Sequence, residues 1–202
     1  MSDGTPAVTH VLYLHGFRSS PRSTKAQQVA HRMRTFHPGV TWLCPQLPPS
    51  PAQAMKEVAD AIAAWPAAGL GVIGSSLGGF YATWVAEHFG GRAVLLNPAV
   101  NAARDLAGYI GEHTAWHDPA ERFHFEPRFV DELRALDAGP ITRPERYCAV
   151  IAKGDEVLDW HEMAARYPGA HIKLLEGSDH ALSDFGAHID DVFRFLGLST
   201  PS

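Results

Sequence analysis

The sequence predicts an α/β protein in which helices cover both faces of a six-stranded parallel sheet. Three observations favour this class. Apolar runs of strand length recur along the chain, and each is nearly continuous in its apolar character, as expected for strands buried on both faces. Longer segments with helix-starting and helix-ending residues separate the runs. Polar loops follow the last two runs, and open α/β sheets build their sites at the carboxyl ends of strands.

The predicted strands are six short apolar runs. They cover residues 10–14, 40–44, 70–74, 92–96, 147–152 and 171–175. Because crossover connections between parallel strands are right-handed, the first strand is placed beside the third. We therefore predict the strand order 2-1-3-4-5-6.

Helix signals lie between these runs. Thr24 and Gln27 match a capping box ahead of a first helix. Ser50 followed by Pro51 matches an N-cap with proline at the first helical position of a second helix. Apolar residues at helical spacing predict a closing helix over 184–196.

Composition restricts both the class of protein and its partners. The chain has 202 residues, 46% of them hydrophobic and 19% charged, so we expect one globular domain over residues 1–202. The formal net charge of -5 is unlike the basic face of a nucleic-acid binder. No apolar run reaches the roughly 18 residues that a bilayer crossing needs. The first ten residues lack the pattern of a targeting peptide, so a cytoplasmic location is predicted. Cys44 and Cys148 lie far apart in apolar stretches and are predicted to be buried thiols rather than a disulfide.

One interval breaks the alternation of strands and helices. About fifty residues separate Asn97 from Arg146, far more than a plain crossover requires. We therefore predict an insertion over 101–145, whose aromatic and histidine-rich middle forms a lid over the site or, alternatively, a packed subdomain. His113 and His117 have the spacing of two metal ligands on a helix, but no further ligand set is evident. No metal is predicted.

The most informative motif is G-x-S-x-G, with Ser76 between Gly74 and Gly78. It stands between a predicted strand and a helix over 76–89, the context of a nucleophile elbow. The chain must turn within one residue there, and glycine two positions to either side leaves room for the close passage. Ser75 competes as nucleophile, but its neighbours two positions away are larger than glycine. We predict Ser76 as the nucleophile.

A serine nucleophile needs a base and an orienting acid, which in this arrangement follow in the order Ser, Asp or Glu, His. Asp155 follows the fifth predicted strand and His180 follows the sixth. We predict that these residues act on Ser76 as acid and base. Asp159 and Asp179 remain alternatives for the acid, and Asp159 also suits the cap of the next helix.

An oxyanion hole must bind the charge that develops on the carbonyl oxygen. We expect the backbone N–H of Leu77, directly after the nucleophile, and that of Phe17, in the loop after the first strand, to supply it. Gly16 permits the close approach of this loop, although His15-Gly16 can also be read as an ordinary turn that ends a strand.

These motifs together resemble the α/β-hydrolase superfamily and, more narrowly, the YqiA-like esterases. The resemblance rests on residues 13–21 with Lys25-Ala26, and on residues 74–83, 96–100, 154–159 and 179–180. It implies the superfamily fold with a reduced six-stranded sheet and a short lid. It also implies hydrolysis of a carboxylic ester by Ser76, Asp155 and His180. The sequence departs from the family pattern at Ser178, where a second glycine is expected.

The prediction is therefore a serine esterase that acts through an acyl-enzyme on a small acyl ester and needs no cofactor. Hydrolysis of acyl-CoA or another thioester by the same residues is the alternative. A catalytically silent interaction module is a third possibility, against which the intact serine, aspartate and histidine argue. Gly69, Gly71 and Gly74 match G-x-G-x-x-G, but they lie before and within a strand rather than after it, so no nucleotide is predicted.

Overall fold

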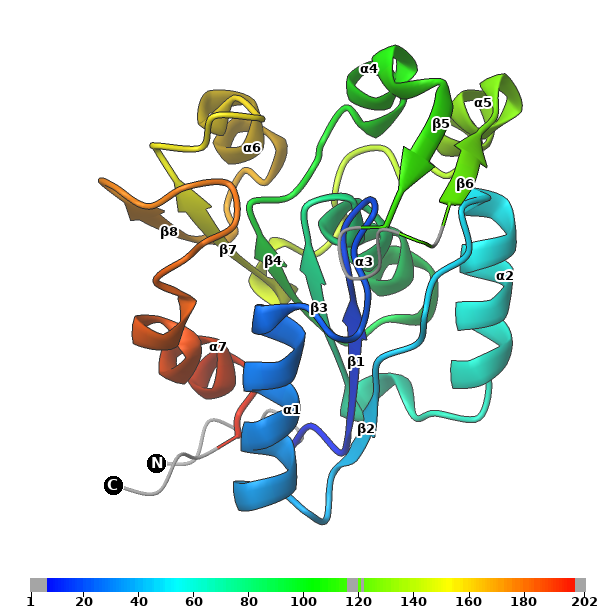
Figure 1. Cartoon of the computed structure of the whole chain (residues 1–202). Coiled ribbons are helices and arrows are strands. Elements are labelled where there is room, and N and C mark those ends of the chain that lie inside the picture. The colour runs from blue at the N-terminus through cyan, green and yellow to red at the C-terminus, as the bar shows by residue number, and fades with distance from the viewer. Residues whose placement is uncertain (1–6, 116–119, 121, 199–202) are drawn as a thin grey trace.

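The structure is a computed structural model that describes residues 7–115, 120 and 122–198 (Figure 1). Its elements in chain order are β1 (His10–Leu14), α1 (Thr24–Phe36), β2 (Thr41–Leu43), α2 (Pro51–Ile62), η1 (Ala67–Gly69), β3 (Leu70–Ser75), α3 (Leu77–Phe89), β4 (Arg92–Leu96), α4 (Ala102–Leu106), η2 (Ala107–Tyr109), β5 (Gly111–Thr114), β6 (Arg122–Phe125), α5 (Pro127–Ala135), η3 (Pro144–Arg146), β7 (Tyr147–Ala152), α6 (Trp160–Arg166), β8 (His171–Leu175), η4 (Phe185–Ala187) and α7 (Ile189–Phe195). The η elements are single 3-10 turns.

Six strands form one parallel sheet in the order β2-β1-β3-β4-β7-β8. The predicted order is thereby confirmed. Four strands have the predicted bounds, whereas β2 loses one residue at each end and β3 extends to Ser75. Every residue of β3 and β7 is buried, which explains the continuous apolar runs from which these strands were predicted.

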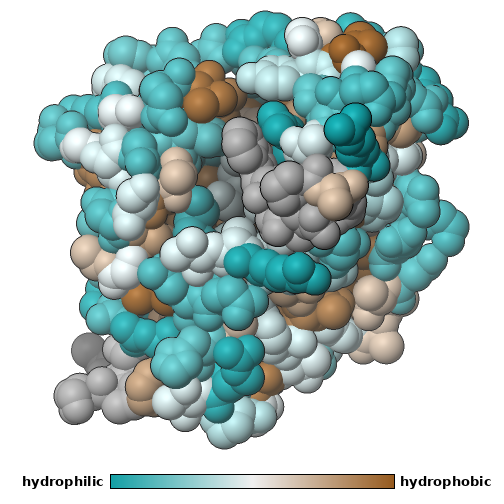
Figure 2. All heavy atoms as spheres, in the orientation of Figure 1, coloured by the Kyte–Doolittle hydropathy of each residue, from teal (hydrophilic) through white to brown (hydrophobic). Residues whose placement is uncertain are grey.

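Two apolar clusters lie on opposite faces of the sheet. One packs α1 and α7 against the strands, and the other packs α2, α3, α5 and α6, so that the sheet is the middle of three layers (Figure 1). Side chains that alternate along a strand enter different clusters: Leu12 and Leu14 join the second, and Val11 and Tyr13 join the first. The outer surface drawn in Figure 2 is mostly hydrophilic, with apolar residues in small separate groups.

The capping box predicted for α1 is wrong, although the helix itself lies where expected. Thr24 is already helical, and the extended residue before it, Ser23 (φ -59°, ψ 148°), is the N-cap. An N-cap residue must have non-helical backbone angles, which excludes Thr24. The side chain of Gln27 donates a hydrogen bond of 2.7 Å to the carbonyl of Pro21.

The closing helix also differs from the prediction over 184–196. The 3-10 turn η4 comes first, and α7 starts only at Ile189. The amide of His188 donates to the carbonyl of Phe185, an i to i-3 bond that tightens the chain ahead of α7. Gly186 lies in this turn, and glycine is a poor helix former.

The inserted segment folds as α4, η2, the antiparallel hairpin β5–β6 and α5. Its hairpin has only four residues a strand, too short a pattern to be predicted from the sequence. Glu132 in α5 accepts hydrogen bonds from Ser50 Oγ (2.7 Å) and from the amide of Ala52 (3.0 Å). Ser50 is the N-cap of α2, as predicted. The insertion is therefore attached to the start of that helix.

The helical arrangement considered for His113 and His117 is wrong at His113, which lies in strand β5. His117 is outside the described residues. Within the described ranges, no group of three histidine, cysteine, aspartate or glutamate side chains is arranged to hold a metal ion. Cys44 and Cys148 are free thiols, the first half-buried and the second buried. No helix in the described part of the chain is long and apolar enough to cross a bilayer.

Candidate active site

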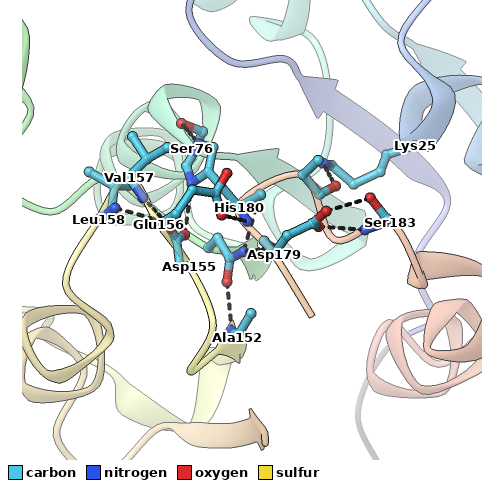
Figure 3. A network of polar contacts seen from close by, with 12 residues as sticks. Lys25, Ser76, Ala152, Asp155, Glu156, Val157, Leu158, Asp179, His180 and Ser183 are labelled. Atoms are coloured by element: carbon cyan, nitrogen blue, oxygen red, sulfur yellow. Dashed lines mark hydrogen bonds and ion pairs between the residues drawn. The ribbon is translucent and has the colours of Figure 1, made fainter. Parts of the chain in front are cut away.

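The carboxyl ends of β3, β7 and β8 bring the three predicted side chains together (Figure 3). His180 Nε2 lies 3.0 Å from Ser76 Oγ, and His180 Nδ1 lies 2.7 Å from Asp155 Oδ2. The imidazole thus stands between hydroxyl and carboxylate, with one ring nitrogen toward each. This is the hydrogen-bond arrangement of a serine nucleophile, its general base and an orienting acid.

Ser76 occupies a strained turn between β3 and α3. Its φ is +54° and its ψ is -119°, a backbone conformation that side chains with a Cβ rarely adopt. A Cβ at Gly74 would lie 2.1 Å from the carbonyl oxygen of Gly78, and a Cβ at Gly78 would lie 1.9 Å from that of Leu14. The two glycines of the motif are therefore required by close backbone contacts on both sides of the serine.

Hydrogen bonds to neighbouring segments hold this turn. The amide of Ser76 donates to the carbonyl of Leu96 at the end of β4, 3.0 Å away. The carbonyl of Ser76 accepts from the amides of Gly79 (2.8 Å) and Ala99 (3.0 Å). Both backbone groups of the strained residue are thus used, which stabilises a conformation that would be unfavourable in isolation.

The carboxylate of Asp155 is enclosed and fully engaged. Its side chain is 0% exposed, and its Oδ1 accepts hydrogen bonds of 2.8 Å from the amides of Val157 and Leu158. The other oxygen is left for His180. Because the two amides fix the plane of the carboxyl group, Oδ2 is directed at the ring of the histidine.

The two alternative acids have other partners. Asp159 Oδ1 accepts from the amide of His161, 2.9 Å away, and caps α6 as considered from the sequence. Asp179 binds the amide and the hydroxyl of Ser183 at 2.9 and 2.7 Å. These hydrogen bonds hold the pKa of both aspartates below their ordinary values. Among the described residues, the carboxylate bonded to the ring of His180 is that of Asp155.

Asn97 is a buried residue of the site that the sequence reasoning did not identify. It is 1% exposed and has a φ of +41°. Its Nδ2 donates to the carbonyls of Asp179 (2.9 Å) and His180 (3.2 Å), and its Oδ1 accepts from the amide of Ala152 (2.8 Å). It thereby joins the ends of β4 and β7 to the loop that carries His180, called the histidine loop below. The sequence did contain a signal for Asn97, because it is a polar residue directly after an apolar strand. The same kind of position led to the prediction of Asp155.

Further contacts fix the histidine loop. The amide of His180 donates to Glu156 Oε2, 3.0 Å away, so both backbone groups of the histidine are held. Ser178, where the resemblance led us to expect glycine, has a φ of +67°, in the left-handed region that glycine favours. Its hydroxyl donates to Asp184, 2.5 Å away.

The loop after β1 passes directly beside Ser76. A Cβ at Gly16 would lie 3.2 Å from both the carbonyl oxygen of Ser75 and the Cβ of Ser76. Gly16 therefore allows the close approach expected of an oxyanion loop. Leu77 is the first residue of α3, and an amide at that position has no partner within its own helix.

A buried histidine supports the same loop. His15 Nε2 accepts a hydrogen bond of 3.0 Å from the amide of Leu47. Its other nitrogen, Nδ1, lies 3.0 Å from the carbonyl of Gly16 and must carry a proton to bond there. A ring nitrogen that accepts a hydrogen bond carries no proton, so the imidazole of His15 is neutral. We therefore assign His15 a structural role, as a support of the loop after β1.

The insertion contacts the next two residues of this loop. Arg18 Nε donates to the carbonyl of Thr114 in β5, 2.9 Å away, and Arg18 Nη2 lies 3.3 Å from Thr114 Oγ1. The ring of Phe17 makes edge-on contacts, at centroid distances of 5.3 to 5.8 Å, with four rings of the insertion. They belong to Tyr109, His113, Phe123 and Phe125. The insertion therefore helps to position the loop after β1, which is the predicted oxyanion loop.

A cavity of about 850 Å³ adjoins Ser76 and His180. Its apolar wall includes Phe17, Leu106 and Tyr109, two of which belong to the insertion. A second, more polar part of the lining comes from β1, α1 and the segment after His180.

Two comparisons with known proteins agree with this architecture. A model of the family described as "Uncharacterised protein family (UPF0227)" matches residues 10–197. Mouse alpha/beta hydrolase domain-containing protein 10 is 17% identical with a TM-score of 0.66, over 93% of this chain and 90% of that protein. Est1E from Butyrivibrio proteoclasticus is 15% identical with a TM-score of 0.68, over 94% and 87%.

A monoacylglycerol lipase from Paleococcus ferrophilus is 16% identical with a TM-score of 0.66, and 96% of each chain is covered. At these identities the likeness concerns the fold. Together with the order of the sheet, it shows that the chain has the α/β-hydrolase fold.

Proposed function

The chain belongs to the family UPF0227, and on that premise we propose that it is a serine hydrolase that cleaves carboxylic esters. The observation that carries the proposal is the continuous path from Ser76 Oγ through both nitrogens of His180 to the enclosed carboxylate of Asp155. A hydroxyl is a weak nucleophile until a base removes its proton. A base 3.0 Å away, oriented by a buried acid, meets that need.

Acylation follows from this geometry. His180 Nε2 accepts the proton of Ser76 Oγ as the oxygen bonds to the ester carbonyl carbon. Asp155 holds the proton on Nδ1, so that Nε2 is the basic nitrogen, and stabilises the imidazolium that forms. When the tetrahedral intermediate collapses, the bond to the alcohol oxygen breaks and His180 delivers its proton to that oxygen.

Deacylation repeats the sequence with water. A water molecule bonds to the acyl carbon while His180 takes one of its protons, and collapse returns this proton to Ser76 Oγ. The carboxylic acid is released and the enzyme is restored. Every proton in the two halves of the cycle passes through the same nitrogen, so the scheme requires no cofactor.

We assign the oxyanion hole to the backbone amides of Leu77 and Phe17. The first begins α3, where free N–H groups and the helix dipole favour negative charge. The second lies one residue after Gly16, which approaches the nucleophile closely. Loss of one such donor typically reduces kcat by about 10² to 10³.

We also propose that the insertion over 101–145 serves as a lid that covers the acyl side of the cavity. Leu106 and Tyr109 line the cavity, and aromatic side chains of the hairpin enclose Phe17. A wall of this composition favours apolar or aromatic acyl groups.

The decisive experiment removes the nucleophile. Ser76→Ala is expected to lower the turnover of p-nitrophenyl butyrate by at least about 10³-fold and to abolish labelling by a fluorophosphonate. Thermal unfolding checks that the variant is folded. Ser75→Ala is the matched control, because it removes the neighbouring hydroxyl and leaves the labelled residue in place. If Ser76→Ala is still labelled, the nucleophile lies elsewhere and the proposal is wrong.

The same preparation separates oxygen esters from thioesters. Butyryl-CoA and p-nitrophenyl butyrate present the same acyl group with different leaving atoms. We expect the oxygen ester to be hydrolysed with the larger kcat/KM. The reverse order would keep the three residues in their roles and identify the chain as a thioesterase.

A further inference from the structure

A lysine lies beside the histidine loop, and the scheme for ester hydrolysis gives it no role. Lys25 is half-buried and lines the cavity next to Ser76 and His180. Its ammonium group donates a hydrogen bond to the carbonyl of Ala181, the residue that follows the predicted base. Figure 3 shows this side chain reaching the loop from α1, a helix that carries none of the three predicted catalytic side chains. Lys25 thus connects a separate element to the chain directly beside His180.

The position of Lys25 is unfavourable for α1 by itself. It is the second residue of the helix, where the dipole and the free N–H groups favour negative charge and oppose a cation. The first turn of α1 contains no acidic side chain that could offset the lysine. The interactions that stabilise a cation there must therefore come from outside the helix, and the histidine loop supplies them.

Two carboxylates provide the opposite charge. Burial lowers the pKa of Lys25, and the negative charges of Asp179 and Asp155 act against this shift. Hydrogen bonds from Ser183 lower the pKa of Asp179, and the charge of Lys25 adds to that effect. The ammonium group therefore interacts both with the carboxylate that is bonded to the ring of His180 and with the carboxylate next to it in sequence.

The other charged side chains around the cavity are engaged elsewhere. In the described part of its lining they are Arg18, which donates to the insertion, and Asp105, which forms an ion pair of 2.8 Å within α4. Outside the lining, Glu156 adds a third carboxylate beside the histidine loop, at the amide of His180. Lys25 is thus the cation that faces a loop surrounded by negative charge.

A base surrounded by carboxylates alone would favour the wrong protonation state. Negative charge near an imidazole stabilises the imidazolium, and a protonated Nε2 cannot accept the proton of Ser76. The carboxylate of Asp155 is needed to orient the ring, while Glu156 and Asp179 hold the loop through hydrogen bonds. A cation at the position of Lys25 reduces the net negative potential at the ring and leaves all of these hydrogen bonds in place.

We propose that Lys25 is a positioning residue of the active site, which holds the histidine loop through the carbonyl of Ala181 and offsets the carboxylates around His180. This inference rests on the proposed ester hydrolysis at Ser76. Lys25 does not touch the reacting atoms and transfers no proton. It raises the fraction of molecules in which the imidazole is both unprotonated and placed against Ser76 Oγ.

Lys25→Met tests the proposal, because methionine keeps an unbranched, flexible side chain but carries no charge and donates no hydrogen bond. We expect kcat for p-nitrophenyl butyrate to fall by about tenfold, the lower bound for a hydrogen bond from a charged group, with little change in KM. The acid limb of the profile of kcat/KM against pH should move to higher pH by about half a unit, because the lost cation no longer opposes the imidazolium. Release of p-nitrophenol, followed at its isosbestic wavelength, gives both readouts.

Three further variants separate charge from packing. Lys25→Arg keeps the charge and a donor, so it should keep the wild-type pH profile and recover most of kcat. Lys25→Gln keeps a donor without the charge, and we expect the same shift of the acid limb as in Lys25→Met. Lys56→Met is the matched control, because it makes the same substitution at an exposed lysine of α2 that pairs with Asp60. It should retain wild-type kcat and pH profile, and thermal unfolding checks that each variant is folded.

The outcomes distinguish this inference from the esterase proposal. If wild-type protein neither hydrolyses p-nitrophenyl butyrate nor is labelled at Ser76, the esterase proposal fails. If wild-type protein is active and Lys25→Gln keeps its kcat and pH profile, Lys25 does not act on His180 and this inference is overturned. A loss of kcat in equal proportion at every pH would overturn it as well, because it is the result of a structural role alone. A rise in KM at unchanged kcat would place Lys25 against the substrate, which also contradicts the inference.

Discussion

The edge of the sheet and the insertion meet at the same cavity but are held there by different interactions. At the edge, backbone geometry and enclosed hydrogen bonds determine where Ser76, Asp155 and Asn97 lie. The insertion reaches the site through side chains, by the ring cluster on Phe17 and the bonds from Arg18 to Thr114. Under the proposed function, the edge is suited to fix the reacting atoms, and the insertion is suited to adjust which substrate reaches them.

The edge of the sheet and the insertion also differ in how deeply their polar groups are buried. A polar group that loses its partner inside the protein bears the full cost of desolvation, whereas one near the surface regains water. Asp155 and Asn97 have enclosed side chains. The hairpin of the insertion, in contrast, carries the exposed pair His124–Glu112. Substitutions at the edge should therefore have large effects, and those in the insertion small ones.

The largest effect is expected from Asp155→Asn. The amide keeps the shape of the side chain but cannot hold a proton on His180 Nδ1 in the same way, so the basic nitrogen no longer faces Ser76. We expect kcat for p-nitrophenyl butyrate to fall by about 10⁴-fold, as is typical of this substitution in serine hydrolases.

Asp159→Asn is the control for this change, since asparagine caps a helix about as well as aspartate. It should retain wild-type kcat. An equal loss in both variants would mean that the loop, and not the carboxylate at 155, limits turnover.

A smaller but still large effect is expected from Asn97→Ala. It leaves the amide of Ala152 and two carbonyls without their partner, and alanine is disfavoured at a φ of +41°. We expect the free energy of unfolding to fall by about 3 kcal/mol in urea denaturation. Because His180 loses an anchor, kcat should fall about tenfold or more while KM changes little.

Asn101→Ala provides the comparison, because the side-chain amide of Asn101 donates a hydrogen bond to Glu162 on the surface rather than to buried backbone. The expected cost is below about 1 kcal/mol, with kcat unchanged. A loss of stability at Asn97 without any change in kcat would show that it stabilises the fold but does not position the histidine.

The same division explains what the sequence could predict. The strands and their order follow from apolar runs and crossover handedness, and Ser76 follows from a short motif with glycine two positions to either side. Asp155 and His180 lie within a few residues of strand ends, so their meeting follows from topology. These features depend on short stretches of chain or on the order of the strands.

The features that escaped prediction depend on tertiary contacts. The roles of Asn97 and Glu156 arise from partners in other loops, and nothing in their own segments reports those partners. The hairpin of the insertion has too few residues for a clear pattern. The cap of α1 was misplaced by one residue because Ser23 and Thr24 are both suitable caps, and only the backbone angles distinguish them.

The smallest effect, and the sharpest test of the comparison, is expected from Arg18→Gln. This change removes the bonds from the oxyanion loop to Thr114 and leaves the edge of the sheet intact. A partly buried hydrogen bond contributes about 1 kcal/mol, which bounds the effect on kcat at a few-fold. Because the loop carries the amide of Phe17, we expect the loss of about threefold to appear in kcat rather than in KM.

Arg22→Gln is the control for Arg18→Gln, because it removes the same charge four residues later in the chain. It should leave kcat unaltered. If Arg18→Gln lowers kcat by 10³-fold or more, the insertion fixes the reacting atoms as firmly as the sheet does, and the division between the two regions fails. If it changes only KM, the bond to Thr114 shapes the cavity and does not hold the oxyanion loop. A threefold loss in kcat alone would show that the insertion contributes to catalysis through the position of one loop.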